Sequence, residues 1–145
     1  MNRFLKAAYE EALTSKQEDE VPVGAVIVYK NKIIGKGHNE SNNITVSNHA
    51  ELKAIDQAIK YLNDWRLNEC EMYVTLEPCP MCAGAILKSR IKKVYIGTPS
   101  NIKSNQDIIE SIFKNKEFYN CVDCEYLNDE NCSKILTDFF KEKRL

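Results

Sequence analysis

Two short stretches restrict the possible fold of this chain more than any other feature. They are His49-Ala50-Glu51 and Pro78-Cys79-Pro80-Met81-Cys82. Each stands at the start of a run with helical spacing of apolar residues, from His49 to about Leu62 and from about Pro80 to Ser89. A β-rich run, Glu71–Leu76, lies between the two. A right-handed crossover can therefore bring the two helix starts side by side at one edge of a sheet.

The residue types at these helix starts are those of a catalytic zinc site. Cys79 and Cys82 are three residues apart in a helical turn, so both can reach one ion at roughly 2.3 Å. With His49 they make three ligands, whereas a structural zinc site uses four and a catalytic site keeps a place for water. Glu51 is close enough to act on that water. The two helix N-termini favour thiolate over thiol.

Each of these residues also has a simpler interpretation. Glu51 could close a capping box on Asn48, and His49 alone could be an ordinary structural histidine. A single C-x-x-C is weak evidence by itself. Both halves open predicted helices, about 30 residues apart, so their chance association is improbable and the catalytic zinc interpretation is favoured. The pattern H-x-E followed by P-C-x-x-C is the established signature of the zinc nucleobase deaminases.

The remaining apolar patterns predict alternating helices and strands. Residues 2–15 show helical spacing, and Val21–Tyr29 and Lys32–His38 are β-rich runs around a Lys30-Asn31 turn, which indicates a hairpin. A polar loop follows at 39–47. Farther along, the sequence predicts a strand at Val94–Gly97, a helix at Gln106–Asn115, a strand at Phe118–Leu127 and a helix at Glu130–Lys143. This order predicts a three-layer α/β/α fold with a central mixed five-stranded sheet.

Length and composition limit the class of protein further. The chain has 145 residues and no Gly/Ser/Pro-rich linker or repeat, so we expect one domain over 1–145. No stretch approaches the roughly 18 apolar residues of a membrane span, and no signal peptide is recognisable. We therefore expect no membrane partner and a cytoplasmic location, in which the six cysteines stay reduced. The net charge of −1 gives no overall attraction to nucleic acid.

Several longer motifs resemble the bacterial tRNA-specific adenosine deaminases, within the cytidine-deaminase-like superfamily. They are Glu20-Val21-Pro22-Val23-Gly24-Ala25, Gly37-His38-Asn39, Asn63-Asp64-Trp65-Arg66-Leu67, the run 73–86 (YVTLEPCPMCAGAI) and Asp138-Phe139-Phe140. The resemblance covers nearly the whole chain. It implies a CMP/dCMP-type deaminase domain with one Zn²⁺ per subunit, a homodimer, and hydrolytic conversion of adenosine to inosine at the wobble position (34) of a tRNA anticodon stem-loop.

The resemblance also implies roles for particular residues. A zinc-bound hydroxide would attack C6 of adenine while Glu51 shuttles protons. Asn39 would hydrogen-bond the purine, although an asparagine there could also just tie down its own loop. The remaining predicted substrate contacts, some of which could equally be ordinary core residues, are Val21, Ala50, Leu76 and Pro78.

Two loops depart from the family pattern. Before the histidine this chain reads Val46-Ser47-Asn48 where the family usually has Asp-Pro-Thr-Ala, and 98–105 contains no glycine and no acid. Since the second loop lies near the RNA in the family, these changes concern substrate contacts more than chemistry. Basic residues cluster at Lys88, Arg90, Lys92 and Lys93, and again at Lys141, Lys143 and Arg144. Either cluster could bind phosphate groups, but the side chains of such runs are commonly exposed to solvent without a binding role.

The other candidate ligands are less persuasive. Cys121 and Cys124, with Cys132 downstream, suggest a second zinc site, but residues three apart on a strand point to opposite faces. We therefore expect no second site, and we expect His38 to be a surface or loop residue and not a ligand. Two other functions remain open: a superfamily deaminase of a free base or nucleotide (guanine or cytosine type), and a non-catalytic zinc-stabilised RNA-binding module.

Overall fold

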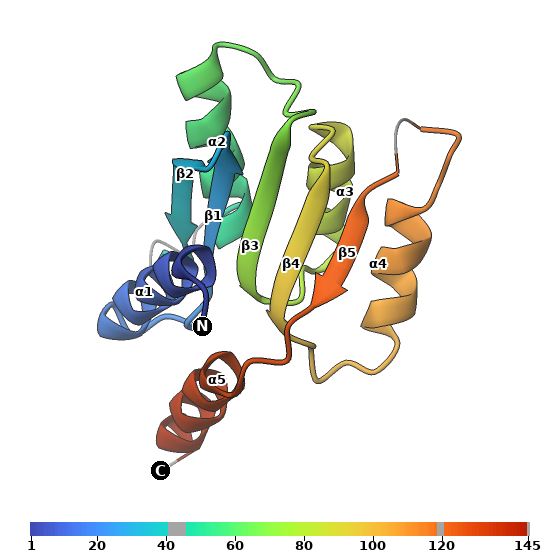
Figure 1. Ribbon diagram of the computed structural model, residues 1–145. Helices are drawn as coiled ribbons and strands as arrows, with labels where there is room; N and C mark the ends of the chain where they lie inside the picture. The colour runs from blue at the N-terminus through green and yellow to red at the C-terminus, as the bar shows by residue number, and fades with distance from the viewer. Residues whose placement is uncertain (41–45, 119–120, 145) are drawn as a thin grey trace.

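The computed structural model describes residues 1–40, 46–118 and 121–144, and Figure 1 shows how their helices and strands are arranged. The helices are α1 (Arg3–Gln17), α2 (Ala50–Leu62), α3 (Pro80–Lys88), α4 (Asn105–Phe113) and α5 (Glu130–Lys143). The strands are β1 (Gly24–Tyr29), β2 (Lys32–His38), β3 (Cys70–Leu76), β4 (Lys93–Thr98) and β5 (Asp123–Tyr126). None of the helices in these ranges is long and apolar enough to cross a membrane.

The five strands form one mixed sheet in the order β2-β1-β3-β4-β5. Strand β1 pairs antiparallel with β2 and β3, whereas β3, β4 and β5 run parallel. The predicted hairpin is confirmed, because Tyr29 pairs with Lys32 across a turn in which Lys30 and Asn31 have φ of 48° and 66°. Two positive φ values are typical of the type I′ turn, which matches the twist of a hairpin.

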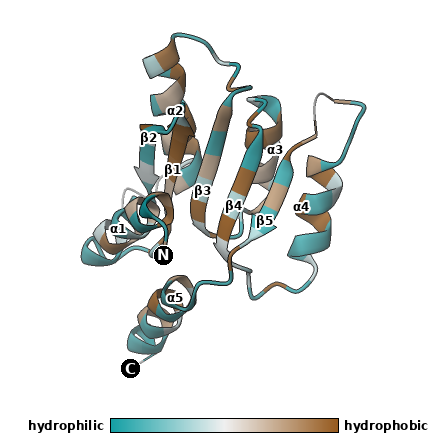
Figure 2. Cartoon of the chain, in the orientation of Figure 1, coloured by the Kyte–Doolittle hydropathy of each residue, from teal (hydrophilic) through white to brown (hydrophobic). Residues whose placement is uncertain are grey.

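The helices cover both faces of the sheet and so confirm the predicted three-layer architecture (Figure 1). Helices α1 and α5 lie on one face, and α2, α3 and α4 lie on the other. In Figure 2 strand β1 carries a continuous hydrophobic stretch, while β3, β4 and the outer helices alternate between hydrophobic and more hydrophilic residues. This alternation is expected for helices with one buried face. The larger core lies between the sheet and α2, α3 and α4.

Small residues allow α2 to lie very close to β2. Ala50, Ala54 and Ala58 face the sheet from α2 and are completely buried. A Cβ atom added at Gly37 of β2 would collide with the carbonyl oxygen of Ala50 and would lie 2.8 Å from the backbone nitrogen of Ala54. Glycine is therefore required at Gly37 by this close approach. The contact holds the start of α2, where His49 lies, against the end of the hairpin.

Two predicted strands are longer than the observed ones. Strand β1 begins at Gly24 and not at Val21, because Pro22 has no N–H for pairing and the N–H of Val23 bonds the carbonyl of Val21 at 2.9 Å. Strand β5 covers only Asp123–Tyr126 of the predicted 118–127. Phe118 closes a turn on the carbonyl of Asn115, and 119–120 lie outside the described residues.

Strand β2 and helix α5 have their predicted bounds, and the other predicted elements differ by small shifts at their ends. Helix α1 continues to Gln17, and α4 begins at Asn105 instead of Gln106. The predicted loop at 39–47 is described only in part, because 41–45 lie outside the described residues.

Candidate active site

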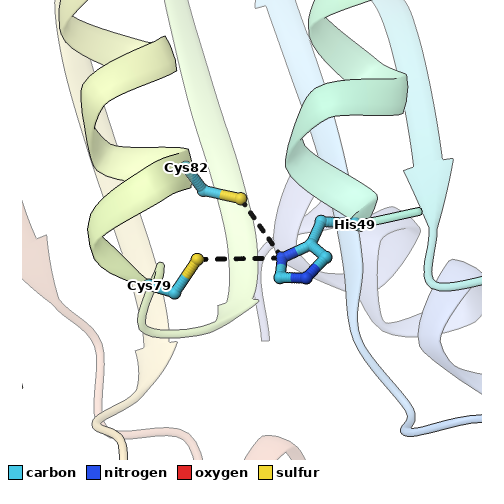
Figure 3. A group of neighbouring side chains, drawn as sticks. All are labelled: His49, Cys79 and Cys82. Atoms are coloured by element: carbon cyan, nitrogen blue, oxygen red, sulfur yellow. Dashed lines mark hydrogen bonds between the residues drawn. The ribbon is translucent and has the colours of Figure 1, made fainter. Parts of the chain in front are cut away.

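The structure brings His49, Cys79 and Cys82 together at the starts of α2 and α3 (Figure 3). The Nδ1 atom of His49 lies 3.8 Å from the sulfur of Cys79 and 3.3 Å from the sulfur of Cys82. In Figure 3 both sulfurs point toward this ring nitrogen. The three predicted ligands therefore converge from two helices that are separated in sequence by strand β3.

Their spacing fits one tetrahedral metal ion. With metal–nitrogen and metal–sulfur bonds of roughly 2.0 and 2.3 Å, a nitrogen and a sulfur ligand lie roughly 3.5 Å apart. The measured distances of 3.3 and 3.8 Å lie on either side of this value. Among the residues that the structure describes, this is the one group of three histidine, cysteine or acidic side chains close enough to hold a metal. One imidazole and two thiolates form a donor set that suits zinc.

His49 and Cys79 occupy the N-cap positions of α2 and α3, and neither side chain caps its own helix. Both side chains are therefore available to the cluster. Pro80 follows at the first position of α3, where its missing N–H costs nothing. The Cys82 thiol donates a hydrogen bond to Cys79, which lowers the pKa of Cys79 to about 5 and raises that of Cys82. The cluster thus already stabilises one thiolate.

Glu51 lies in the first turn of α2 and is only 4% exposed. Burial raises the pKa of its carboxyl group to about 7, although its own backbone N–H and the neighbouring His49 partly oppose this shift. A carboxyl group with a pKa near neutrality can both accept and return a proton. Because the N-cap is His49 and not Asn48, the capping-box alternative for Glu51 does not apply.

A cavity of about 380 Å³ opens in front of this cluster. Its volume lies in the range of small-molecule sites. The cavity lies where the parallel strands end, which is the usual ligand position in open α/β sheets. Its lining consists of Glu20, Val21, Val23, Asn39, Glu40, Asn48, His49, Glu51, Leu76, Glu77, Cys79, Pro80, Ser100, Ile102 and Asn105.

The predicted substrate contacts fall into two groups. Val21, Asn39 and Leu76 line the cavity. Ala50 and Pro78 are buried beside it. The backbone N–H of Ala50 donates to Asn39 Oδ1 at 2.9 Å, and the carbonyl of Pro78 accepts from Asn105 at 3.0 Å. Ala50 and Pro78 therefore shape the surroundings of the cavity.

Sequence reasoning missed a buried hydrogen-bonded group beside the cluster. The carboxylate of Glu77 accepts from Asn105 Nδ2 and from the Tyr126 hydroxyl, both at 2.6 Å. Burial and this bond raise the pKa of Tyr126. The position of Glu77 directly before Pro78-Cys79 could have singled it out. Nothing in the local sequence marks Asn105 or Tyr126, because their contacts form only when α4 and β5 meet β3.

The remaining cysteines lie apart from the cluster. Cys121 is exposed and precedes β5, Cys124 lies on β5, and Cys132 is buried on α5. They form no metal-binding group within the described part of the chain. His38 is the last residue of β2, as in the predicted strand Lys32–His38, and it is partly exposed. Its ring nitrogens lie 3.1 Å from Glu11 of α1 and 3.4 Å from Glu18, the C-cap residue of that helix.

The fold and the site together define a deaminase of the cytidine-deaminase-like class. Residues 1–144 match the family described as MafB19-like deaminase. The chain is 42% identical to the tRNA-specific adenosine deaminase of Buchnera aphidicola subsp. Baizongia pistaciae, over 97% of this chain and 88% of that protein. It is 37% identical to the Bacillus subtilis enzyme of the same name, over 97% and 89%. The chain belongs to the MafB19-like deaminase family and to the tRNA-specific adenosine deaminases.

Solved structures agree with this assignment. A structure from work on A-to-I editing by tRNA:A34 deaminases superimposes with a TM-score of 0.81 and 32% identity, covering 92% of this chain and 98% of the other. The guanine deaminase from Bacillus subtilis superimposes with a TM-score of 0.65 and 30% identity, covering 100% and 96%.

Proposed function

We propose that this protein hydrolyses the exocyclic amine of adenosine at the wobble position (34) of a tRNA anticodon and so produces inosine. The observation that supports this most directly is the position of Glu51. Its buried carboxyl group lies beside the His49, Cys79 and Cys82 cluster and opens into the same cavity. A buried glutamate that is not itself a ligand, beside a three-ligand metal site, is the arrangement that hydrolytic deamination uses.

The three ligand residues would hold one zinc ion per chain. Nδ1 of His49 and the sulfurs of Cys79 and Cys82 would supply three of its four bonds. When bound, zinc would lower the pKa of a coordinated water to about 7 and make a nucleophile available at neutral pH. The two helix starts would stabilise negative charge at this position.

Glu51 would carry the protons of the reaction. It would take one proton from the attacking water and deliver it to N1 of adenine. It would then take the proton of the new C6 hydroxyl group and give it to the amino group, which leaves as ammonia when the C6–N6 bond breaks. Burial disfavours the charged form of this carboxyl group and so raises its pKa, which favours a group that returns a proton as well as taking one. Its place on α2 beside His49 holds it in this position.

Asn39 would bind the purine through its side-chain amide group. Its Oδ1 already accepts from the N–H of Ala50, so the Nδ2 group is the part oriented for a ring nitrogen of the base. Val21 and Leu76 would provide the apolar walls on either side, and Ala50 and Pro78 would support them from behind. An anticodon loop is already unpaired, so presenting its base costs less than flipping one out of a duplex.

The proposed substrate is the anticodon stem-loop of a tRNA, and the proposed active form is a homodimer in the cytoplasm. We also propose that 1–145 forms one deaminase domain, in keeping with the one five-stranded sheet that its described residues form. The relatives named for tRNA support the substrate, and so does an adjoining groove that contains Lys141 and Arg144. Cations near the cavity mouth are suited to phosphate groups.

A side-by-side assay tests the proposed function. Purified protein is incubated with an anticodon stem-loop that carries adenosine at position 34, with the same stem-loop carrying guanosine there, and with free adenosine, guanine and cytosine. We expect inosine and ammonia from the first substrate only. Turnover of guanine instead would favour the second candidate, a guanine deaminase, which the 30% identity to the Bacillus subtilis enzyme keeps in consideration. Ammonia release from any of these substrates would exclude a non-catalytic RNA-binding module.

A further inference from the structure

The carboxylate of Glu77 is buried where three segments meet. Glu77 directly follows β3 and is 4% exposed. Asn105 at the start of α4, which is 5% exposed, donates to Oε1 at 2.6 Å. Tyr126 at the end of β5 donates to Oε2 at 2.6 Å. Both carboxylate oxygens therefore have a partner, as a buried carboxylate requires.

Glu77 holds both ends of one cavity loop. Its backbone N–H donates to the carbonyl of Thr98 at 2.9 Å, and its side chain accepts from Asn105. The loop between these two anchors, 99–104, contributes Ser100 and Ile102 to the cavity wall. Loop residues are normally the most mobile part of a binding site, so anchoring both ends restricts the wall that they form.

Asn105 joins this loop to the ligand-bearing turn. Its Nδ2 group donates to Glu77 Oε1 and also to the carbonyl of Pro78, at 3.0 Å. Carboxylate and carbonyl oxygens only accept, so this amide can be oriented in one way. Pro78 directly precedes Cys79. One amide group thus connects the loop that lines the cavity with the turn that carries a predicted metal ligand.

We propose that Glu77 and Asn105 are positioning residues that set the affinity for the substrate by holding the 99–104 loop against the Cys79 turn. This rests on the proposed function, since the substrate is the one that the cavity would take. Neither residue exchanges a proton or an electron with that substrate. They act through Ser100 and Ile102, which face the cavity, while Tyr126 only secures the far oxygen of Glu77.

Three variants of the zinc-loaded protein separate the contributions of Asn105, Glu77 and Tyr126 to the position of the loop. Asn105→Ala removes both bonds of the amide. Glu77→Gln retains a carbonyl oxygen for Asn105 and an amide that can donate to the hydroxyl oxygen of Tyr126, so it is the conservative variant. Tyr126→Phe leaves the Glu77–Asn105 bond intact and serves as the matched control.

The first measurement is amide hydrogen exchange in the free protein, which needs no substrate. In Asn105→Ala we expect exchange across 100–104 to rise by about tenfold or more, because a hydrogen bond to a charged group is lost. Exchange across β1 and α1 should stay as in the wild type, and Glu77→Gln and Tyr126→Phe should change the loop by less than about threefold. Unchanged exchange in the loop, or an equal rise throughout the protein, overturns the proposal.

The second measurement separates KM from kcat on the anticodon stem-loop. Asn105→Ala should raise KM by about tenfold while kcat changes by less than about threefold and the zinc content stays the same. Glu77→Gln should keep most of the wild-type affinity for the stem-loop. A loosened loop with an unchanged KM overturns the positioning role. If the wild-type protein leaves the stem-loop unchanged, the proposed function fails, and the exchange measurement still decides whether Glu77 and Asn105 hold the loop.

Discussion

Asn39 and Ala50 are joined by a hydrogen bond of 2.9 Å between the side-chain oxygen of Asn39 and the backbone N–H of Ala50. Asn39 follows β2, and Ala50 is the first residue of α2. A residue outside the helix therefore satisfies one of the N–H groups that every helix start leaves free. Because His49 uses its side chain for the ligand cluster and not for capping, this bond lets the helix start without a cap of its own.

Asn39 is predicted to have two separable roles, one in the helix and one with the base. Asn39→Ala should lose the helix contact, at a cost of about 1 kcal/mol in the free energy of unfolding, and should also lose affinity for substrate. Asn39→Asp keeps an oxygen for Ala50 but has no N–H to donate. It should unfold at nearly the wild-type temperature and still bind the stem-loop about tenfold more weakly. Normal deamination by Asn39→Asp would leave Asn39 with the helix role alone.

Glu51→Gln is predicted to abolish turnover without loss of metal. The substituted amide fits the same space but cannot transfer a proton, so kcat should fall by about 10²- to 10⁴-fold. Metal analysis of the purified variant should still find one zinc per chain, because the three ligands are untouched. Glu40→Gln, which changes a carboxyl group at the rim of the same cavity, serves as the control and should retain activity. Near wild-type deamination by Glu51→Gln would remove Glu51 from the mechanism.

The metal-free protein is predicted to show a pH dependence that comes from Glu51. Burial raises the pKa of this carboxyl group from 4.5 to about 7 in the folded state. The folded protein therefore holds this proton more tightly than the unfolded chain. The resulting stabilisation is fully present below about pH 4.5 and is lost as the pH rises through about 7, on the order of 3 kcal/mol in total.

Urea unfolding of wild-type and Glu51→Gln protein, with metal removed and thiols reduced, measures this contribution. As the pH rises from 5 to 8, the unfolding free energy of the wild type should fall relative to that of Glu51→Gln. The comparison reports the titration of Glu51 together with its electrostatic coupling to Cys79, whose lowered pKa acts in the opposite direction. A difference that does not vary with pH would contradict the prediction.

Metal content should depend on Cys82 and not on the cysteines near the C-terminal end. Cys82→Ala removes one of the three ligands. The purified variant should contain far less than one zinc per chain and should unfold at a lower temperature. Cys121→Ala changes an exposed thiol outside the cluster and should retain one zinc per chain. Elemental analysis after gel filtration measures both. Two zinc ions per wild-type chain would contradict the expectation of a single site.

Two glycine-to-alanine substitutions should have opposite effects on stability. Gly37→Ala places a Cβ atom against the carbonyl oxygen of Ala50 and should cost about 1–3 kcal/mol as α2 is pushed from β2. Gly84→Ala lies in α3, where the added Cβ would meet no atom within 4 Å apart from the neighbouring backbone of its own helix, and it should stabilise the protein by about 1 kcal/mol. Thermal unfolding followed by circular dichroism measures both. Equal effects from the two substitutions would argue against a close contact between β2 and α2.

Local patterns in the sequence were sufficient to predict the order of the helices and strands, the hairpin at Lys30-Asn31 and the convergence of His49, Cys79 and Cys82. These features depend on neighbours in sequence: apolar spacing, turn residues, and a helix start that places residues three apart on one side. The predicted strand ends at Val21 and Phe118 were wrong, because β propensity does not reveal where hydrogen-bond partners end.

The sequence by itself determined the fold class and supplied the residue types of the candidate site, since the first follows from short-range periodicity and the second from residues with distinctive donor atoms. Only the tertiary structure decided that Glu77 is bound by Asn105 and Tyr126, that Asn39 completes the start of α2, and that Glu51 is buried enough to raise its pKa to about 7. Each of these depends on contacts between segments far apart in the chain. Burial and hydrogen-bond partners of this kind arise only when the layers pack, so no local pattern encodes them.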